Sequence, residues 1–148
     1  MDKTKNRFVI LCHGAFNYVK NKTGNMLIRY RTEEVVGVID NTKVGETAHS
    51  ELGYGGNIPV VESFDSCLAS NPDTLVIGSA SQGGFISDEF RKEIIKAIEF
   101  GCDIISGMHH FLNDDKEIRE LAKKHNITLT DLRRPPEPAN FPKGSWKN

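Results

Sequence analysis

Two adjacent histidines, His109 and His110, follow a short apolar run and are the residues of this chain best suited to proton transfer. A neutral imidazole can act as a general base near pH 7, and it can also bind a metal ion. No second ligand stands at a spacing such as H-E-x-x-H, so we predict no metal site. Adjacent residues point in different directions. We therefore assign the acid-base role to His109, while His110 contacts the ligand, packs or is solvated.

A glycine pair lies between an apolar run and a helical pattern, in the segment Ser79 to Gly84. Gly83 and Gly84 would let a ligand approach backbone N–H groups closely, and a helix N-terminus favours an anion. We therefore count Ser79, Gly83 and Gly84 among the ligand-binding candidates. A purely structural tight turn is the alternative explanation for the glycines.

The turn after the first apolar run, His13-Gly14-Ala15-Phe16, stands where dinucleotide-binding folds hold phosphate. It has one glycine where the G-x-G-x-x-G fingerprint has three, so a standard nicotinamide site is not indicated. Lys22 and Thr23 follow, but they do not complete the G-x-x-x-x-G-K-[ST] phosphate loop. Lys22 could neutralise a phosphate or carboxylate, or it could lie on a solvated helix face.

Two further charged residues stand at strand ends. Asp40 follows an apolar run, where an acid could accept hydrogen bonds from ribose hydroxyls or simply cap a loop. Arg133 follows the last apolar run and could grip a carboxylate, or it could pair with Asp131. Both readings remain open for each residue.

The elements that must position these residues alternate along the chain. Leu75 to Ile77 and Ile104-Ile105 read as buried parallel strands, and between them lies an amphipathic helix with Ser87 as N-cap and Gly101 at its end. The crossover of such a unit is right-handed. It places Ser79 to Gly84 and Ser106 to His110, including Gly107, at the same edge of the sheet, where open α/β sheets bind ligands.

Similar elements flank this unit. About six strands alternating with helices predict a Rossmann-like, doubly wound, mostly parallel sheet with helices on both faces. A short helix capped by Ser63 is expected to turn Phe64, Cys67 and Leu68 inward. The other expected strands are residues 8–12, 35–39, 59–61 and 127–132; the other expected helices are residues 20–31 and one that starts at Asn113 or Asp114; residues 41–57 form a loop with one helical turn.

The bulk properties fit one domain over residues 1–134, followed by a proline-rich linker or hinge over residues 135–148. A formal net charge of -1 gives no electrostatic reason to expect nucleic acid or an anionic membrane as partner. No signal segment or membrane span is visible, and three separate cysteines read as buried thiols of a reducing compartment. We therefore predict a cytoplasmic protein.

Several strings in a fixed order resemble one known family. They are G-A-F at residues 14–16, K-T at 22–23, V-I-D at 38–40, I-P-V-V at 58–61, T-L-V-I-G at 74–78, G-G at 83–84, S-G-x-H at 106–109 and D-x-R-x-P-P at 131–136. Together they are similar to the N-terminal Rossmann-like domain of the DgcN family, the D-glutamate N-acetyltransferase-like proteins, long known as a domain of unknown function. The resemblance covers nearly all of residues 7–142.

The resemblance implies transfer of an acetyl group from acetyl-CoA to the amino group of D-glutamate. It also implies a P-loop-like C-terminal domain beyond the hinge, without which we expect these residues to be inactive. The ligand would be an anionic small molecule, and the cofactor acetyl-CoA or a dinucleotide; a homo-oligomer is compatible with this picture. Two alternatives remain: the NAD(P)-binding domain of an oxidoreductase, and a coenzyme A-binding or sensing module.

Overall fold

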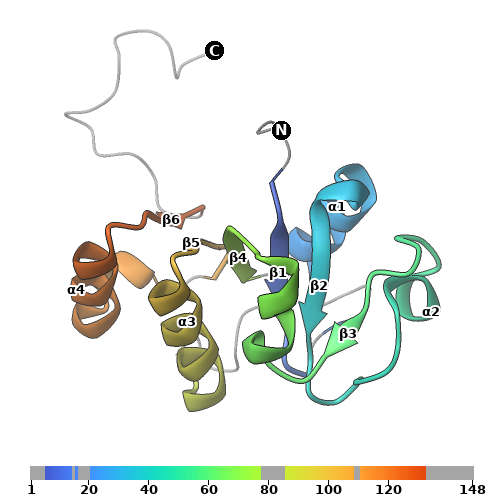
Figure 1. The fold of residues 1–148 in the computed structure, drawn as a ribbon, viewed down its shortest axis with the longest axis horizontal. Helices are drawn as coiled ribbons and strands as arrows, with labels where there is room; N and C mark the ends of the chain where they lie inside the picture. Colours follow the sequence, from blue (N-terminus) through green and yellow to red (C-terminus); the bar gives the residue numbers. More distant parts are fainter. Residues whose placement is uncertain (1–5, 15, 17–20, 78–85, 109–110, 133–148) are drawn as a thin grey trace, which may run out of the picture.

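Short apolar runs form the centre of the molecule, a six-stranded sheet whose pairings are all parallel. The structure is a computed structural model that describes residues 6–14, 16, 21–77, 86–108 and 111–132. The strand order is β3-β2-β1-β4-β5-β6, which confirms the predicted doubly wound arrangement (Figure 1). The strands are β1 Phe8–Leu11, β2 Val35–Ile39, β3 Val60–Val61, β4 Thr74–Ile77, β5 Asp103–Ser106 and β6 Leu129–Asp131.

Helical segments connect the strands. The α-helices are α1 Lys22–Tyr30, α2 Ala48–Leu52, α3 Asp88–Phe100 and α4 Lys116–His125. The short 3-10 helices are η1 Thr32–Glu34, η2 Phe64–Ser70 and η4 Leu112–Asp114. As the sequence predicts, the Ser87 side chain accepts a hydrogen bond from the Phe90 N–H at the start of α3, and Gly101 ends that helix in the left-handed conformation.

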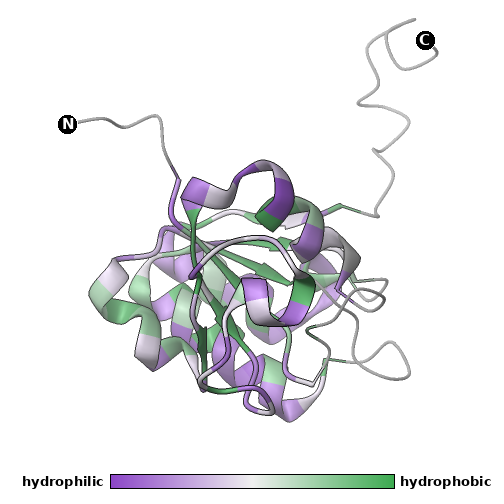
Figure 2. Cartoon of the chain, turned by 90° about the vertical axis from the view of Figure 1, so that its right-hand side faces the viewer, coloured by the Kyte–Doolittle hydropathy of each residue, from purple (hydrophilic) through white to green (hydrophobic). Residues whose placement is uncertain are grey.

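Alternate strand residues pack on opposite faces of the sheet, because side chains in a strand alternate in direction. Val9 and Leu11 belong to a core with residues of η2, α3 and α4, whereas Phe8 and Ile10 belong to a core with residues of α1 and α2. Figure 2 shows the hydrophobic strands enclosed by helices whose hydrophilic residues lie outside. Helices therefore cover both faces, as predicted.

Two local predictions need correction. Leu68 is not turned inward but is 40% exposed, while Phe64 and Cys67 are buried. The segment is a 3-10 helix, and its three residues per turn align positions three apart rather than four. The helix predicted from Asn113 or Asp114 starts later, because the side chain of Asp115 accepts the Ile118 N–H and caps α4.

Helix α1 contains Gly24, which lowers intrinsic helix stability but lets the helix approach the sheet. A Cβ atom on Gly24 would lie 2.7 Å from Ile10 Cγ2 and 2.6 Å from Asn21 Oδ1. A larger residue would therefore force the side chains of Ile10 and Asn21 to shift. Close contact between α1 and β1 therefore explains a glycine in this helix.

Candidate functional site

The loop after β1 is fastened by the carboxylate of Asp40, which follows β2. Asp40 is fully buried and accepts hydrogen bonds from the Gly14 N–H at 2.9 Å and the Phe16 N–H at 3.1 Å. Gly14 has a φ of 82°, a conformation that glycine adopts without strain. Asp40 and Gly14, both predicted ligand-binding residues, are therefore in direct contact. The carboxylate stabilises the turn in which Gly14 lies.

The Asp40 carboxylate remains ionised despite its burial. The N–H and the hydroxyl of Thr42 also donate to its Oδ1 atom, at 2.9 and 2.6 Å. Burial by itself would raise the pKa of Asp40, but the hydrogen bonds from Thr42, Gly14 and Phe16 outweigh burial and lower that pKa. Because three of these four donors reach Oδ1, little acceptor capacity remains on this atom for a ribose hydroxyl.

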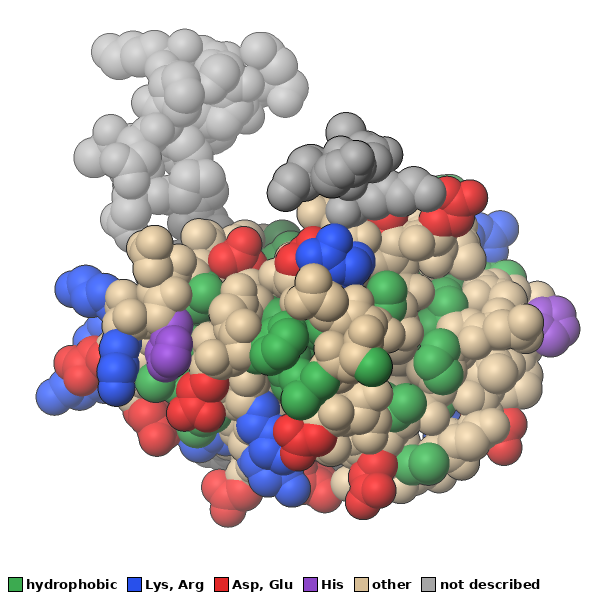
Figure 3. All heavy atoms as spheres, in the orientation of Figure 1, with side chains coloured by type: hydrophobic (Ala, Val, Ile, Leu, Met, Phe, Trp, Pro, Cys, Tyr) green, Lys and Arg blue, Asp and Glu red, His purple; other side chains and the backbone are tan. Residues whose placement is uncertain are grey.

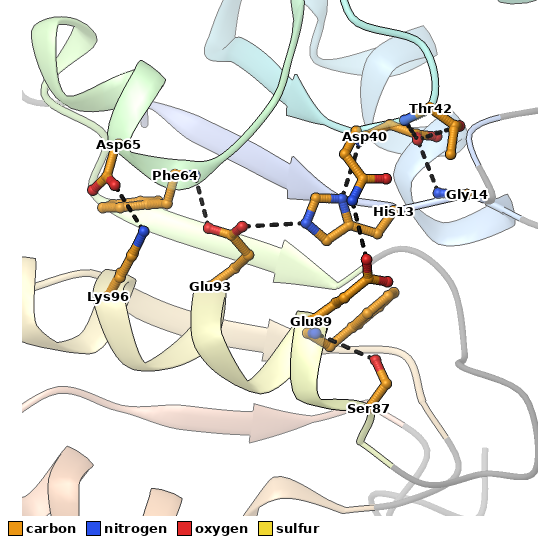
Figure 4. A network of polar contacts seen from close by, with 12 residues as sticks. His13, Gly14, Asp40, Thr42, Phe64, Asp65, Ser87, Glu89, Glu93 and Lys96 are labelled. Carbon is orange, nitrogen blue, oxygen red and sulfur yellow. Dashed lines mark hydrogen bonds and ion pairs between the residues drawn. The ribbon is translucent and has the colours of Figure 1, made fainter.

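His13 belongs to this loop, and its side chain is 3% exposed. Its Nδ1 atom accepts the Asn41 N–H at 3.1 Å, and its Nε2 atom lies 3.2 Å from Glu93 Oε2 (Figure 4). The backbone donor at Nδ1 assigns the proton of the neutral ring to Nε2, which donates to Glu93. Both ring nitrogens are therefore engaged within the protein.

Glu93 is a buried acid on α3 that the sequence analysis missed. Its exposed fraction is 1%, and its Oε1 atom accepts the Phe64 N–H at 2.8 Å. Burial opposes ionisation, but the hydrogen bonds from His13 and Phe64 outweigh burial and lower the pKa of Glu93. Glu93 therefore joins the start of η2 and the loop after β1 to helix α3.

A cavity of about 260 Å³ opens next to this buried pair. It lies between α3 and the segments that follow β1, β2 and β3, at the carboxyl edge where open parallel sheets bind ligands. His13 and Glu93 belong to its wall. The other lining residues are Asn41, Glu62, Ser63, Glu89, Lys92 and Lys96.

A second group of predicted residues meets beyond β5. A Cβ atom on Gly107 would lie 2.8 Å from Thr23 Oγ1, so the segment after β5 touches the first turn of α1. The Gly107 N–H donates to the Ile77 carbonyl at the end of β4, and the buried Ser106 side chain accepts the Met108 N–H. Thr23 therefore lies against the segment that contains Ser106 and Gly107, a contact between two predicted ligand-binding segments.

The start of η4 is held by an acid of strand β6. The Asp131 carboxylate, at the end of β6, accepts the N–H groups of Leu112 at 2.7 Å and Asn113 at 3.1 Å. The side-chain amide of Asn113 adds a third hydrogen bond at 2.8 Å. Asp131 therefore holds the start of η4.

Several predicted site residues lie outside the described part of the chain. The proposed base His109 is one of them, and the ligand-binding roles of the whole set stay predictions. The set outside is Ala15, Ser79, Gly83, Gly84, His109, His110 and Arg133, together with the side chain of Lys22.

The described cysteines are free and buried, as predicted. Burial raises the pKa of Cys67 and that of Cys102 to about 12, so both thiols stay protonated at neutral pH and are weak nucleophiles. The residues that the structure describes contain no group of three His, Cys, Asp or Glu side chains arranged around a metal ion. None of the described helices is long and apolar enough to cross a bilayer.

Comparison with known proteins identifies the family to which this chain belongs. The profile of a Rossmann-like domain of unknown function, DUF1611_N, matches residues 41–135. The chain belongs to the DUF1611_N family. A DUF1611 protein from Anabaena variabilis ATCC 29413, known from its crystal structure, is 30% identical, with a TM-score of 0.79 over 89% of this chain and 38% of that protein.

Two curated proteins similar to this DUF1611_N chain are named D-glutamate N-acetyltransferase. The protein from Tritonibacter scottomollicae is 38% identical over 84 residues, which make up 56% of this chain and 25% of that protein. The protein from a Pseudoalteromonas species is 40% identical over 62 residues, 42% of this chain and 19% of that protein. The chain therefore spans about a quarter or less of these relatives.

The fold of this DUF1611_N chain also occurs in a more distant enzyme. A homoserine dehydrogenase from Thiobacillus denitrificans has a TM-score of 0.57 at 20% identity, over 86% of this chain and 29% of that protein. At this identity the likeness concerns the fold alone. It agrees with the Rossmann-like strand order described above.

Proposed function

We propose that this chain is the acceptor-binding, Rossmann-like part of an N-acyltransferase that transfers an acetyl group from acetyl-CoA to the amino group of an acidic amino acid. The similarity to two proteins named D-glutamate N-acetyltransferase carries this proposal and makes D-glutamate the first acceptor to test. Because the chain spans only part of these relatives, the complete reaction is expected to need residues beyond these 148.

The size of the edge cavity supports a small acceptor. Pockets for drug-sized ligands occupy roughly 300–1,000 Å³, and the cavity beside α3 has about 260 Å³. An amino acid suits such a volume, whereas a coenzyme carrying an adenosine group and a long pantetheine arm does not. We therefore place the acceptor in this part of the protein and expect acetyl-CoA to be held largely by other residues.

Direct transfer fits the described side chains better than a thioester intermediate on the protein. The amine must reach the thioester carbonyl as a free base, so a proton has to be removed from the ammonium form. We propose His109 as the group that takes this proton, in keeping with its place after β5. The buried, protonated thiols of Cys67 and Cys102 would serve poorly as acyl carriers.

Release of coenzyme A thiol tests the proposal. The 148-residue chain, and the chain extended by whatever follows Asn148 in its reading frame, are each incubated with acetyl-CoA and D-glutamate, and the thiol is measured with a chromogenic disulfide. We expect acceptor-dependent release from the extended protein and little from the 148 residues. A folded extended protein that binds acetyl-CoA but acetylates no acidic amino acid would contradict the proposal.

A further inference from the structure

The cavity beside α3 is lined by charges of both signs. Glu89, Lys92, Glu93 and Lys96 all line it and recur at spacings of three and four residues, so they form one stripe along the helix. The segment after β3 faces this stripe with Glu62 and Ser63, and Asn41 follows β2. Figure 4 shows Glu89, Glu93 and Lys96 pointing from α3 toward the opposite wall.

Some of these charges are already neutralised. Glu93 is held by His13 and the Phe64 N–H, as described above. Lys96 pairs with Asp65, which lies outside the cavity lining, at 2.7 Å. These two side chains support the wall and have little left to offer a ligand.

The remaining charges are available to a ligand. Within the part of the chain that the structure describes, neither Glu62 nor Lys92 forms an ion pair or side-chain hydrogen bond, and both are exposed. Glu89 accepts one hydrogen bond at 3.1 Å, from the side-chain amide of Asn41, which leaves most of its acceptor capacity unused. The cavity therefore presents two carboxylates, one ammonium group and the Ser63 hydroxyl.

We infer that this cavity binds a free amino acid as a zwitterion, with the ligand's ammonium group between Glu62 and Glu89 and a ligand carboxylate at Lys92. The inference deepens the proposed function and rests on it only for the choice of D-glutamate as the probe. The ligand's ammonium group would form ion pairs with the two carboxylates, and its carboxylate would form an ion pair with the lysine.

Other ligand classes fit these charges less well. A dicarboxylate without an ammonium group would meet Lys92 but would also be repelled by Glu62 and Glu89. The surface around α3 and α4 carries interspersed acidic and basic side chains rather than one sign of charge, so it would not offset this repulsion (Figure 3). The sequence predicts an anionic ligand; these charges narrow that expectation to one that also carries a positive charge.

Three probes of similar length test separately whether the cavity binds an ammonium group and whether it binds a carboxylate. D-glutamate carries the ammonium group and two carboxylates, glutarate lacks the ammonium group, and 4-aminobutyrate lacks the α-carboxylate. Titrated into the ¹⁵N-labelled chain, D-glutamate is expected to shift the amide signals of Asn41, Ser63 and Phe64 and to bind at least threefold more tightly than glutarate. Equal affinity for glutarate, or no binding of D-glutamate at all, would overturn the inference.

Variants of Glu62 and Lys92, two exposed charged residues at the rim of the cavity, provide the second test. Glu62→Gln and Lys92→Met keep the side-chain size and remove the charge, and each is expected to weaken D-glutamate binding about threefold to fivefold, as for partly exposed ion pairs. The matched controls Glu99→Gln on the same helix and Lys124→Met on α4 lie outside the lining and should leave the affinity unchanged. Rim variants that bind D-glutamate like the unmodified chain would place the site elsewhere.

The failure of this inference and that of the proposed function give different results. If acetyl transfer occurs but Glu62→Gln and Lys92→Met leave KM unchanged, the enzyme is confirmed and the cavity assignment is wrong. If D-glutamate binds in the cavity but no acetyl transfer is found with the extended protein, the cavity assignment stands and the acyltransferase proposal fails.

Discussion

Two segments at the carboxyl edge of the sheet, the loop after β1 (the first loop) and the short turn η4 (the second loop), are held in place in the same manner but by different numbers of contacts. In each, an acid at or just beyond the end of the neighbouring strand accepts two backbone N–H groups of the loop: Asp40 for the first loop and Asp131 for the second. The first loop has a further connection, because His13 reaches Glu93 on α3. Among the described residues, the second loop has no comparable buried hydrogen bond between two side chains that reaches a helix packed on the sheet.

The difference suggests a division of work across the sheet. Hydrogen bonds join the first loop to the residues that follow β2 and, through Glu93, to η2 and α3, which suits a wall that must hold the charges of a small cavity in place. In the sequence, the second loop follows His109 by three residues. We therefore expect changes in the first loop to act mainly on stability and binding, and changes near the second to act mainly on turnover.

The largest effect on stability is expected from Asp40→Ala. It leaves the N–H groups of Gly14, Phe16 and Thr42 without their acceptor, and each such loss costs about 1–3 kcal/mol when the donor is buried, so we expect a decrease of about 3–5 kcal/mol in the free energy of unfolding. Asp131→Ala, the matched change in the second loop, should cost about 2 kcal/mol, since Asp131 is less completely buried. Urea denaturation measures both, and an equal or larger loss for Asp131→Ala would remove the contrast between the loops.

Replacement of His109 by alanine tests the other side of the comparison. In the extended protein we expect turnover to fall about 100-fold or more, in line with general-base contributions, with little change in D-glutamate affinity. His13→Ala should instead lower the free energy of unfolding by about 2 kcal/mol, because the Asn41 N–H and the buried Glu93 carboxylate lose their partner. Steady-state kinetics and urea denaturation on both variants decide the point; unchanged turnover in His109→Ala removes His109 from the mechanism.

Replacing the Glu93 carboxylate by an amide is expected to break the hydrogen bond that joins His13 to α3. Glu93→Gln keeps an oxygen for the Phe64 N–H but turns an amide NH₂ group toward the Nε2 proton of His13, so we expect a loss of about 2 kcal/mol in the free energy of unfolding. Glu99→Gln, an exposed change on the same helix, should stay within about 0.5 kcal/mol of the unmodified chain. Similar denaturation midpoints for the two variants would show that the buried pair contributes little.

Most of the fold could be predicted because its signals are local. Continuous apolar runs indicate the strands, and Ser87 and Gly101 mark the ends of α3. The period of η2 could not be predicted, since Phe64, Cys67 and Leu68 suit an α-helix as well as they suit a shorter 3-10 turn.

The candidate site was less predictable because its hydrogen bonds join residues far apart in the sequence. Asp40 was singled out by its place after a strand, but its contact with Gly14 depends on the packed sheet. Glu93 was overlooked, because an acid in a helix is commonly solvated. One signal was present: Glu93 lies three residues after Phe90 and four before Ala97, on the face that the helix buries.

The smallest expected effect, the acid sensitivity of the first loop, sharpens the comparison further. The pKa values of Asp40 and Glu93 are lowered in the folded chain, so the unfolded chain binds protons more readily at these two groups. Their stabilising contribution is complete above the unfolded values of about 4 and is lost as the pH falls through the lower folded values. We therefore expect the free energy of unfolding to decrease below about pH 5, and to decrease less steeply in Asp40→Asn and Glu93→Gln, although both variants are less stable at pH 7. Urea denaturation at intervals between pH 7 and pH 3 measures these slopes, and parallel slopes in the unmodified chain and both variants would show that acid acts through other groups.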